Sequence, residues 1–319
     1  MSIRMLQRFD ELKVNDVHVL KLSMSYIVDT TENNERVFKR YIDNDFFWQH
    51  VNRCQYQPLD YLSEAMKADI RNICDNIIKE AKRGINFGLV AVLKEQLALA
   101  EKDETSSVKY QALQAMSFLL HGFQVWPKSP KESEAQRVSR VDELINIIFK
   151  DCSLKTKTGE TVGDATKEAY CYNESSYSSF CRSKTTSSAG GAAPAITISS
   201  SSAASSNFGR KIDLVVKDNQ DAELAFCEFK AEFKTTTANH QQSKTLRLNL
   251  TILQKMKEMF IDKQLFSFVW TGSFGTFFSL KEYQDIFIAR PADPFVVPVN
   301  LVQLDEDFCN TIITLLNWK

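Results

Sequence analysis

The spacing of apolar residues changes once along this chain of 319 residues, and that change limits the folds it can adopt. Before the change, apolar residues recur every three or four positions, which predicts helices over 37–54, 59–82, 88–102 and 107–121. After a Ser/Ala-rich stretch at about 175–207, the apolar runs become short and continuous, which is typical of strands. Helices followed by strands, with a further helix among the strands, predict an α/β fold.

The chain is expected to divide near residue 130. The segment WPKSP at 126–130 ends the helical series, because proline cannot continue a helix. We therefore predict an all-helical N-terminal region over 1–130 and an α/β domain over 131–319 that opens with a helix over 133–150. The Ser/Ala-rich stretch lies inside the second domain and has too few bulky apolar residues for a core, so we expect a flexible insertion.

The segments after the insertion predict strands around one long helix. KIDLVVK at 211–217 and ELAFCEF at 223–229 are separated by the polar turn DNQD, which favours a β-hairpin. The apolar stripe over 240–263 predicts a helix. FSFVWTG, GTFFSL and DIFIA predict further strands, followed by the proline-interrupted FVVPVNL and a last helix at 306–316.

Charged residues inside the predicted hairpin are the most informative feature for function. Asp213 lies within the first strand, and Glu228 and Lys230 lie two residues apart in the second, so these last two share a face. Adjacent strands are about 4.8 Å apart, so Asp213 can lie beside Glu228 if the register allows. Charges in apolar strands are costly unless they are paired or bind a metal ion.

Two carboxylates in this position suit a hard cation. Mg²⁺ keeps several waters and is bound by one or two acidic side chains together with phosphate oxygens. Such an ion would polarise a phosphate and lower the pKa of a bound water, and Lys230 would orient that water or neutralise developing charge.

The stretch GRKIDLVVKDNQDAELAFCEFK resembles the core signature of the PD-(D/E)xK nuclease superfamily. The resemblance implies a restriction-endonuclease-like fold, with a mixed sheet core flanked by helices. It also implies that Asp213 and Glu228 hold Mg²⁺ or Mn²⁺ and that Lys230 completes the catalytic site. Ile212 stands where the fullest pattern has proline. The following QQSKTLRLN and the Gly272–Gly275 turn resemble a poorly characterised branch found in lower fungi. The resemblance covers residues 133–319.

Glu-x-Lys occurs four times in the chain, so its context has to select one occurrence. The motifs at Glu11 and Glu80 lie in charged and helical stretches, and the motif at Glu232 follows the strand. Only Glu228 ends a predicted strand that directly follows the strand with Asp213.

Further candidate residues lie on the helices around the hairpin. An acidic residue of the preceding helix often completes such sites, and Glu143 is the candidate, although a solvated helix face explains it as well. Gln242 and Asn249 are seven residues apart and share a helix stripe, so they either line the cleft or cap and solvate the helix. A second stripe could contact nucleic-acid phosphates or could be a solvated basic face; it contains Lys244, Arg247 and Lys255.

Composition and motifs exclude several other classes. The net charge of −1 gives no overall attraction to nucleic acid, so a binding site has to be a local patch. Seven cysteines without a C-x-x-C pair and a charged N-terminus favour a reducing intracellular location, nuclear or cytoplasmic, without a secretion signal. No apolar run approaches the roughly 20 residues of a membrane span. No P-loop or G-x-S-x-G motif is present.

These observations lead to two hypotheses of different classes. The first is a Mg²⁺- or Mn²⁺-dependent nuclease that cuts DNA or RNA through Asp213, Glu228 and Lys230. The second is a nuclease fold without catalytic activity that serves as a scaffold for protein or nucleic acid. In either case the N-terminal helices are candidates for binding a protein partner, and a homodimer remains open.

Overall fold

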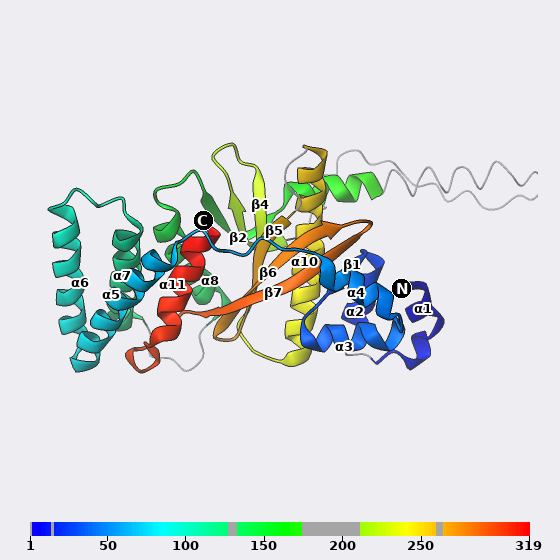
Figure 1. Ribbon diagram of the computed structural model, residues 1–319, viewed down its shortest axis with the longest axis horizontal. Coiled ribbons are helices and arrows are strands. Elements are labelled where there is room, and N and C mark those ends of the chain that lie inside the picture. The colour runs from blue at the N-terminus through cyan, green and yellow to red at the C-terminus, as the bar shows by residue number, and fades with distance from the viewer. Residues whose placement is uncertain (1, 14–15, 127–132, 174–210, 260–263) are drawn as a thin grey trace, which may run out of the picture.

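The computed structural model describes residues 2–13, 16–126, 133–173, 211–259 and 264–319 (Figure 1). The insertion predicted at about 175–207 and the domain boundary predicted at 130 lie outside the described residues. None of the helices within the described residues is long and apolar enough to cross a membrane.

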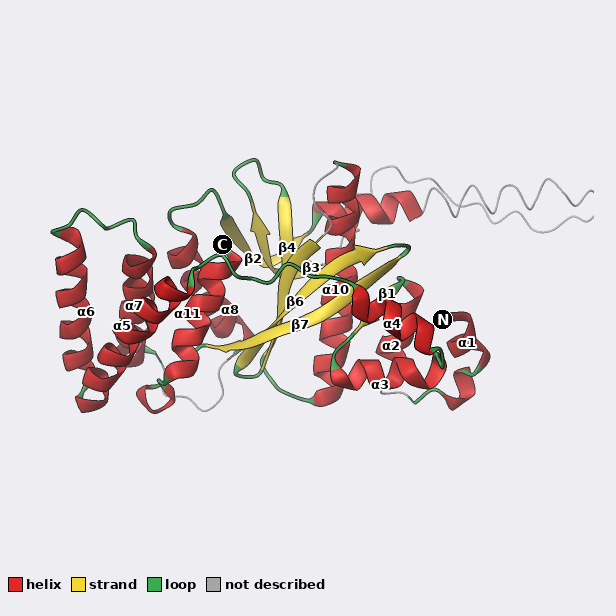
Figure 2. Cartoon of the chain, viewed as in Figure 1, coloured by secondary structure: helices red, strands yellow, loops and turns green. Residues whose placement is uncertain are grey.

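Within the described residues, seven strands form one mixed sheet in the order β1-β7-β6-β5-β4-β3-β2 (Figure 2). The pairs β1/β7 and β4/β5 are parallel, and the other neighbours are antiparallel. The predicted α/β class is therefore confirmed. The strands are β1 (Ile27–Asp29), β2 (Lys155–Val162), β3 (Lys211–Lys217), β4 (Glu223–Lys230), β5 (Gln264–Thr271), β6 (Phe274–Tyr283) and β7 (Ile286–Val296).

Helices begin where the sequence offers a cap. Ser63, Ser107 and Ser133 each accept a hydrogen bond from the backbone N–H three residues later, which starts α5, α7 and α8. The helices are α1 (Ser2–Gln7), α2 (Val17–Met24), α3 (Glu32–Tyr41), α4 (Asp45–Arg53), α5 (Glu64–Arg83), α6 (Ile85–Ala100), α7 (Val108–Val125), α8 (Glu134–Phe149), α10 (Thr235–Glu258) and α11 (Glu306–Trp318), and residues 164–173 are also helical.

Helices cover both faces of the sheet and produce two cores. One face packs against α5–α8 and α11 through a core that includes Phe229, Phe268 and Phe295. The other face packs against α1–α4 and α10 through a core that includes Phe38 and Phe226. In Figure 1, α1–α4 lie at one end of the molecule and α5–α7 at the other. Helices on either side of the sheet thus come from both parts of the chain.

The N-terminal region is helical, as predicted, except at β1. Residues 27–29 are all buried and pair in parallel with 287–289 of β7, so the expectation of an all-helical region is wrong at this point. The helix predicted over 37–54 is also two helices, α3 and α4. The side chain of Asn44 accepts a hydrogen bond from Phe47 N–H (3.2 Å) and caps the second of them.

β7 runs past the strand predicted at DIFIA and continues through two prolines. Pro291 and Pro294 pair with β6, but β1 covers only residues 287–289 on the other side. At both prolines β7 is therefore an edge strand, where a missing N–H does not break a ladder.

Candidate functional site

Asp213 and Glu228 lie opposite each other on adjacent strands. The last registered pair of β3 and β4 at this end is Leu214 with Cys227, so the next step along both strands places Asp213 across from Glu228. Cys227 and Phe229 are fully buried in the core on the α8 side. Glu228 points to the other face, where it contacts α10.

The Glu228 carboxylate is almost completely buried, with 1% of the residue exposed. Its Oε2 accepts hydrogen bonds from Gln241 Nε2 (2.7 Å) and Lys244 Nζ (2.5 Å). Its Oε1 has no hydrogen-bond partner among the described residues. Burial raises the pKa of Glu228 to about 7, because loss of hydration outweighs the stabilising charge of Lys244.

Asp213 is held by the backbone of the neighbouring strand. Its Oδ2 accepts a hydrogen bond from Phe229 N–H (2.8 Å). Burial raises the pKa of Asp213, and the nearby Glu134 acts in the same direction. The Phe229 hydrogen bond and the charges of Lys230 and Lys244 oppose this shift.

Lys230 contacts an acidic residue from α8. Its Nζ lies 3.1 Å from both carboxylate oxygens of Glu134, and both side chains are about one-third exposed. Glu134 is the first residue of α8 and lies within a capping box, in which Ser133 and Gln136 each accept a hydrogen bond from the other's backbone N–H. The capping box fixes the backbone of the first turn of α8, and with it the position of Glu134.

Sequence reasoning expected an acidic residue from this helix but selected Glu143. That residue is exposed on α8, nine positions after Glu134, and the structure does not bring it to the carboxylates. Glu134 was missed because an acidic first-turn residue is explained by the helix dipole alone. Its contact with β4 depends on where α8 packs, which no local pattern indicates.

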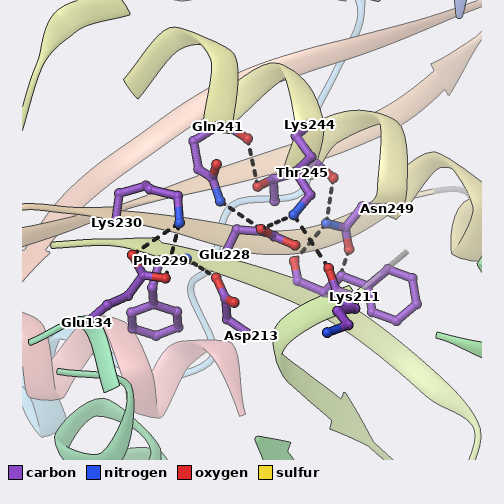
Figure 3. Close-up of polar contacts among 11 residues, drawn as sticks. Glu134, Lys211, Asp213, Glu228, Phe229, Lys230, Gln241, Lys244, Thr245 and Asn249 are labelled. Atoms are coloured by element: carbon purple, nitrogen blue, oxygen red, sulfur yellow. Dashed lines mark hydrogen bonds and ion pairs between the residues drawn. The ribbon is translucent and has the colours of Figure 1, made fainter. Parts of the chain in front are cut away.

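Figure 3 shows three carboxylates in the site, with Lys230 on the Glu134 side and Lys244 on the Glu228 side. Lys244 binds Glu228, Lys230 binds Glu134, and the Asp213 carboxylate lies between those of Glu134 and Glu228. No cluster of three or more His, Cys, Asp or Glu positioned to hold a metal ion occurs within the described residues. Asp213 and Glu228 nevertheless offer hard oxygen ligands. A cation bound there would give the unpartnered Oε1 of Glu228 a partner.

Helix α10 contributes Gln241 and Lys244 to this site. Gln241 was not recognised from the sequence, and Lys244 was expected either to contact phosphates or to belong to a solvated basic face, not to bind Glu228. Their spacing of three residues on one helix face was the available signal. It becomes interpretable only once α10 is known to pack on β4.

The predicted accessory residues Gln242 and Asn249 lie elsewhere. Gln242 Nε2 donates to the buried carboxylate of Asp29 in β1, on the other side of α10. Asn249 is fully buried and holds the backbone of β4: its Oδ1 accepts from Phe226 N–H (2.9 Å) and its Nδ2 donates to Phe226 O (2.8 Å). Both residues therefore have structural partners away from the carboxylates.

The predicted basic stripe of α10 also divides among different contacts. Arg247 Nε donates to Ser243 O (3.2 Å) within the helix. Lys255 pairs with Glu168 (2.9 Å) and is eleven residues, or about 16 Å along the helix, from Lys244. Of the three basic residues, only Lys244 contacts the Glu228 carboxylate in the described structure.

A cavity of about 700 Å³ lies apart from these residues. It is enclosed by the segment before α5, by α11 and by β5–β7, and its lining includes Tyr56, Phe266, Arg290, Asn310 and Asn317. None of the candidate site residues lines it. The cavity is therefore separate from the carboxylate site.

Comparison of the chain with protein-family models, curated proteins and solved structures gives no match. The geometry of the site and the motif are therefore the features that indicate a function.

Proposed function

We propose that this chain is a metal-dependent nuclease that hydrolyses phosphodiester bonds of DNA or RNA with Mg²⁺ or Mn²⁺. The observation that carries the proposal is the buried Oε1 of Glu228, which has no hydrogen-bond partner among the described residues. A carboxylate oxygen is costly to bury without a partner unless a cation is bound there.

Each residue of the site would have a separate role in hydrolysis. Asp213 and Glu228 would hold the cation, and Glu228 would have to lose its proton to do so. The cation would polarise the phosphate and activate a bound water. Lys230, which Glu134 holds at the same edge of the sheet, would place its ammonium beside the reacting phosphate and neutralise charge that develops there.

The arrangement of the strands supports the resemblance to the PD-(D/E)xK superfamily. Such a fold is expected to carry the Asp on one strand and the Glu-x-Lys on the next, within a mixed sheet flanked by helices. Asp213 on β3 and Glu228-x-Lys230 on the adjacent β4 agree with this expectation. The helices before and after the hairpin, α8 and α10, cover opposite faces of the sheet.

The proposal is tested by incubating the protein with plasmid and single-stranded substrates in Mg²⁺, in Mn²⁺ and in EDTA. We expect cleavage only with a metal ion, and at least a hundredfold loss in both Asp213→Ala and Lys230→Ala. Lys13→Ala is the matched control, because Lys13 is the exposed lysine of another Glu-x-Lys. Cleavage at the wild-type rate by either site variant would contradict these roles.

A scaffold without catalytic activity is the second candidate, and the ion pairs favour it. Lys244 binds Glu228 and Lys230 binds Glu134, so both motif side chains have protein partners. On this account nucleic acid or protein binds without a metal ion. Binding of a labelled oligonucleotide that is equal in Mg²⁺ and EDTA, together with no cleavage, would support the scaffold and contradict the nuclease.

A further inference from the structure

An aromatic pair, Phe233 and Phe274, lies at the end of β4 that carries Lys230; Phe233 is exposed and Phe274 is half-buried. Phe233 follows Lys230 by three residues and is 56% exposed. Its ring lies 5.4 Å from that of Phe274, at an interplanar angle of 45°. A ring exposed to this degree can be reached from solvent by a ligand.

The backbone of Lys230 fixes this pair in place. Gly272, in the turn between β5 and β6, donates its N–H to Lys230 O (2.9 Å) and has a φ of 64°, which favours glycine. A Cβ on Gly272 would lie 3.1 Å from Phe233 Cβ, so the loop packs directly on the turn. Trp270 Nε1 donates to Gly272 O (2.9 Å) and steadies the turn from the core side.

We infer that Phe233 and Phe274 stack on an unpaired base of the substrate, so that the site acts on single-stranded nucleic acid. This inference rests on the proposed nuclease function. An exposed ring can stack on the face of any base, whereas in a duplex the neighbouring bases cover those faces. Phe233 is three residues from Lys230 and packs on the turn that is hydrogen-bonded to Lys230 O. A base stacked on the pair would therefore bring its phosphate to the end of β4 where Glu228 and Asp213 lie.

The test is binding of fluorescein-labelled oligonucleotides, single-stranded and duplex, followed by anisotropy in Ca²⁺ with wild type and Phe233→Ala. We expect tighter binding of the single strand, and a loss of about tenfold in Phe233→Ala. Phe233→Trp should keep the affinity, because it preserves a stacking surface. Phe46→Ala is the control, since Phe46 is 72% exposed on α4, away from the site.

The outcomes separate this inference from the proposed function. Cleavage that requires Asp213, with equal affinity of wild type and Phe233→Ala for the single strand, would overturn the inference alone. Tighter binding of duplex than of single strand would overturn it as well. An absence of any nucleic-acid binding or cleavage by the wild type would overturn both.

A second surface stands apart from this site. Helix α6 lies at one end of the molecule (Figure 1) and presents an apolar stripe made of Phe87, Val90, Leu93 and Leu97, which are 48–61% exposed. These residues follow a spacing of three to four, so they share one helix face. Lys94 lies on the same face, four residues after Val90 and three before Leu97, and its apolar stem can lie along the stripe with the ammonium at the rim. A helix this apolar is normally covered on all sides.

The charges at the two ends of α6 are opposite. Next to its start, at the C-terminal end of α5, the exposed Lys79, Lys82 and Arg83 outnumber Glu80. The turn after α6 has an excess of acid from Glu101, Asp103 and Glu104 over Lys102. An antiparallel second α6 would bring basic ends onto acidic ends twice, whereas a parallel one would oppose like charges. We propose that α6 is the contact between two copies of this chain, arranged antiparallel about a twofold axis.

Sedimentation equilibrium of the full chain tests the dimer. We expect twice the chain mass of 36.4 kDa for wild type and the single mass for Leu93→Glu/Leu97→Glu. Met24→Glu/Val302→Glu, at exposed apolar positions elsewhere, should remain dimeric. Glu101→Lys/Glu104→Lys should weaken the dimer, and adding Lys82→Glu/Arg83→Glu should restore it. A monomeric wild type, or a dimer unaffected by the Leu93 and Leu97 changes, would overturn the proposal.

Discussion

Glu228 makes the candidate site sensitive to pH. Its pKa in the folded chain is about 7, above the ordinary value of 4.5, so between these values the folded chain binds more protons than the unfolded chain. The free energy of unfolding therefore falls as the pH rises through this range, and the fall is complete above pH 7. Burial is the main cause, because Lys244 compensates only part of the lost hydration.

Replacing Glu228 by Gln should remove this dependence. We expect the free energy of unfolding of Glu228→Gln, relative to wild type, to rise by about 3 kcal/mol between pH 5 and pH 8, since each pKa unit corresponds to about 1.4 kcal/mol. Urea unfolding at several pH values measures it. Glu143→Gln, on the exposed face of α8, should show no such rise. A difference between Glu228→Gln and wild type that stays constant with pH would contradict the pKa assignment.

The affinity for a metal ion should depend on the same ionisation of Glu228. Glu228 has to be ionised to bind a cation, so Mg²⁺ affinity at pH 6 should be about tenfold weaker than at pH 8, and binding at pH 6 should release close to one proton. Calorimetric titration in two buffers of different ionisation enthalpy measures both quantities. Affinity that is equal at the two pH values would show that Glu228 is not a ligand.

Asn249 has a structural task that its place in the sequence does not reveal. Asn249→Ala leaves the buried N–H and C=O of Phe226 without their side-chain partner. We expect a loss of roughly 2 to 4 kcal/mol in the free energy of unfolding, measured with urea. Gln254→Ala, at an exposed position of the same helix, is the control. An equal loss in both variants would contradict the role given to Asn249.

At the level of elements, α10 connects the candidate site to the N-terminal helices. Gln241 binds Glu228, and the next residue, Gln242, binds Asp29 of β1. Asp29 is fully buried, accepts further hydrogen bonds from Thr31 N–H (2.9 Å) and Asn34 Nδ2 (2.7 Å), and has its pKa raised by burial. The contact ties β1 to the centre of the fold through neutral donors.

Gln242→Leu should loosen that connection. Hydrogen exchange is expected to accelerate in β1, α2 and α3, because Asp29 loses one donor while it stays buried. Exchange in α5–α8, on the opposite face of the sheet, should not change. Gln254→Leu provides the comparison on the same helix. Uniform acceleration of hydrogen exchange over the whole chain would indicate global destabilisation and would contradict a local role for the Gln242–Asp29 contact.

The sequence predicted those elements that have strong periodicity and missed those whose formation depends on distant partners. The hairpin β3–β4 has continuous apolar runs on either side of a polar turn, and helices α5, α7 and α8 begin at serine caps. β1 has three residues, and β2 (KTKTGETV) has almost no apolar residue, so each is a strand because a neighbouring strand pairs with it. The same limit applies to the candidate site. Asp213, Glu228 and Lys230 share a motif, whereas Glu134 and Gln241 reach them only through the packing of α8 and α10.

At the scale of the whole molecule, Asp213 and Glu228 lie together at one place on the sheet. Helices from both ends of the chain cover its two faces. The near-neutral net charge of −1 includes many local ion pairs, among them Lys230–Glu134 and Lys244–Glu228 of the candidate site. A metal ion that binds there would have to compete with Lys244 for Glu228. Stability and metal binding should therefore be linked, so that Mg²⁺ raises the melting temperature of the folded chain.

The central claim is that Asp213 and Glu228 together hold one divalent cation. Titration of Mn²⁺ followed by electron paramagnetic resonance tests it most directly, because only free Mn²⁺ contributes the sharp signal. The structure predicts one bound ion per chain for wild type and none for Asp213→Asn/Glu228→Gln. An absence of binding by the wild type, or an equal stoichiometry in the double variant, would contradict the claim.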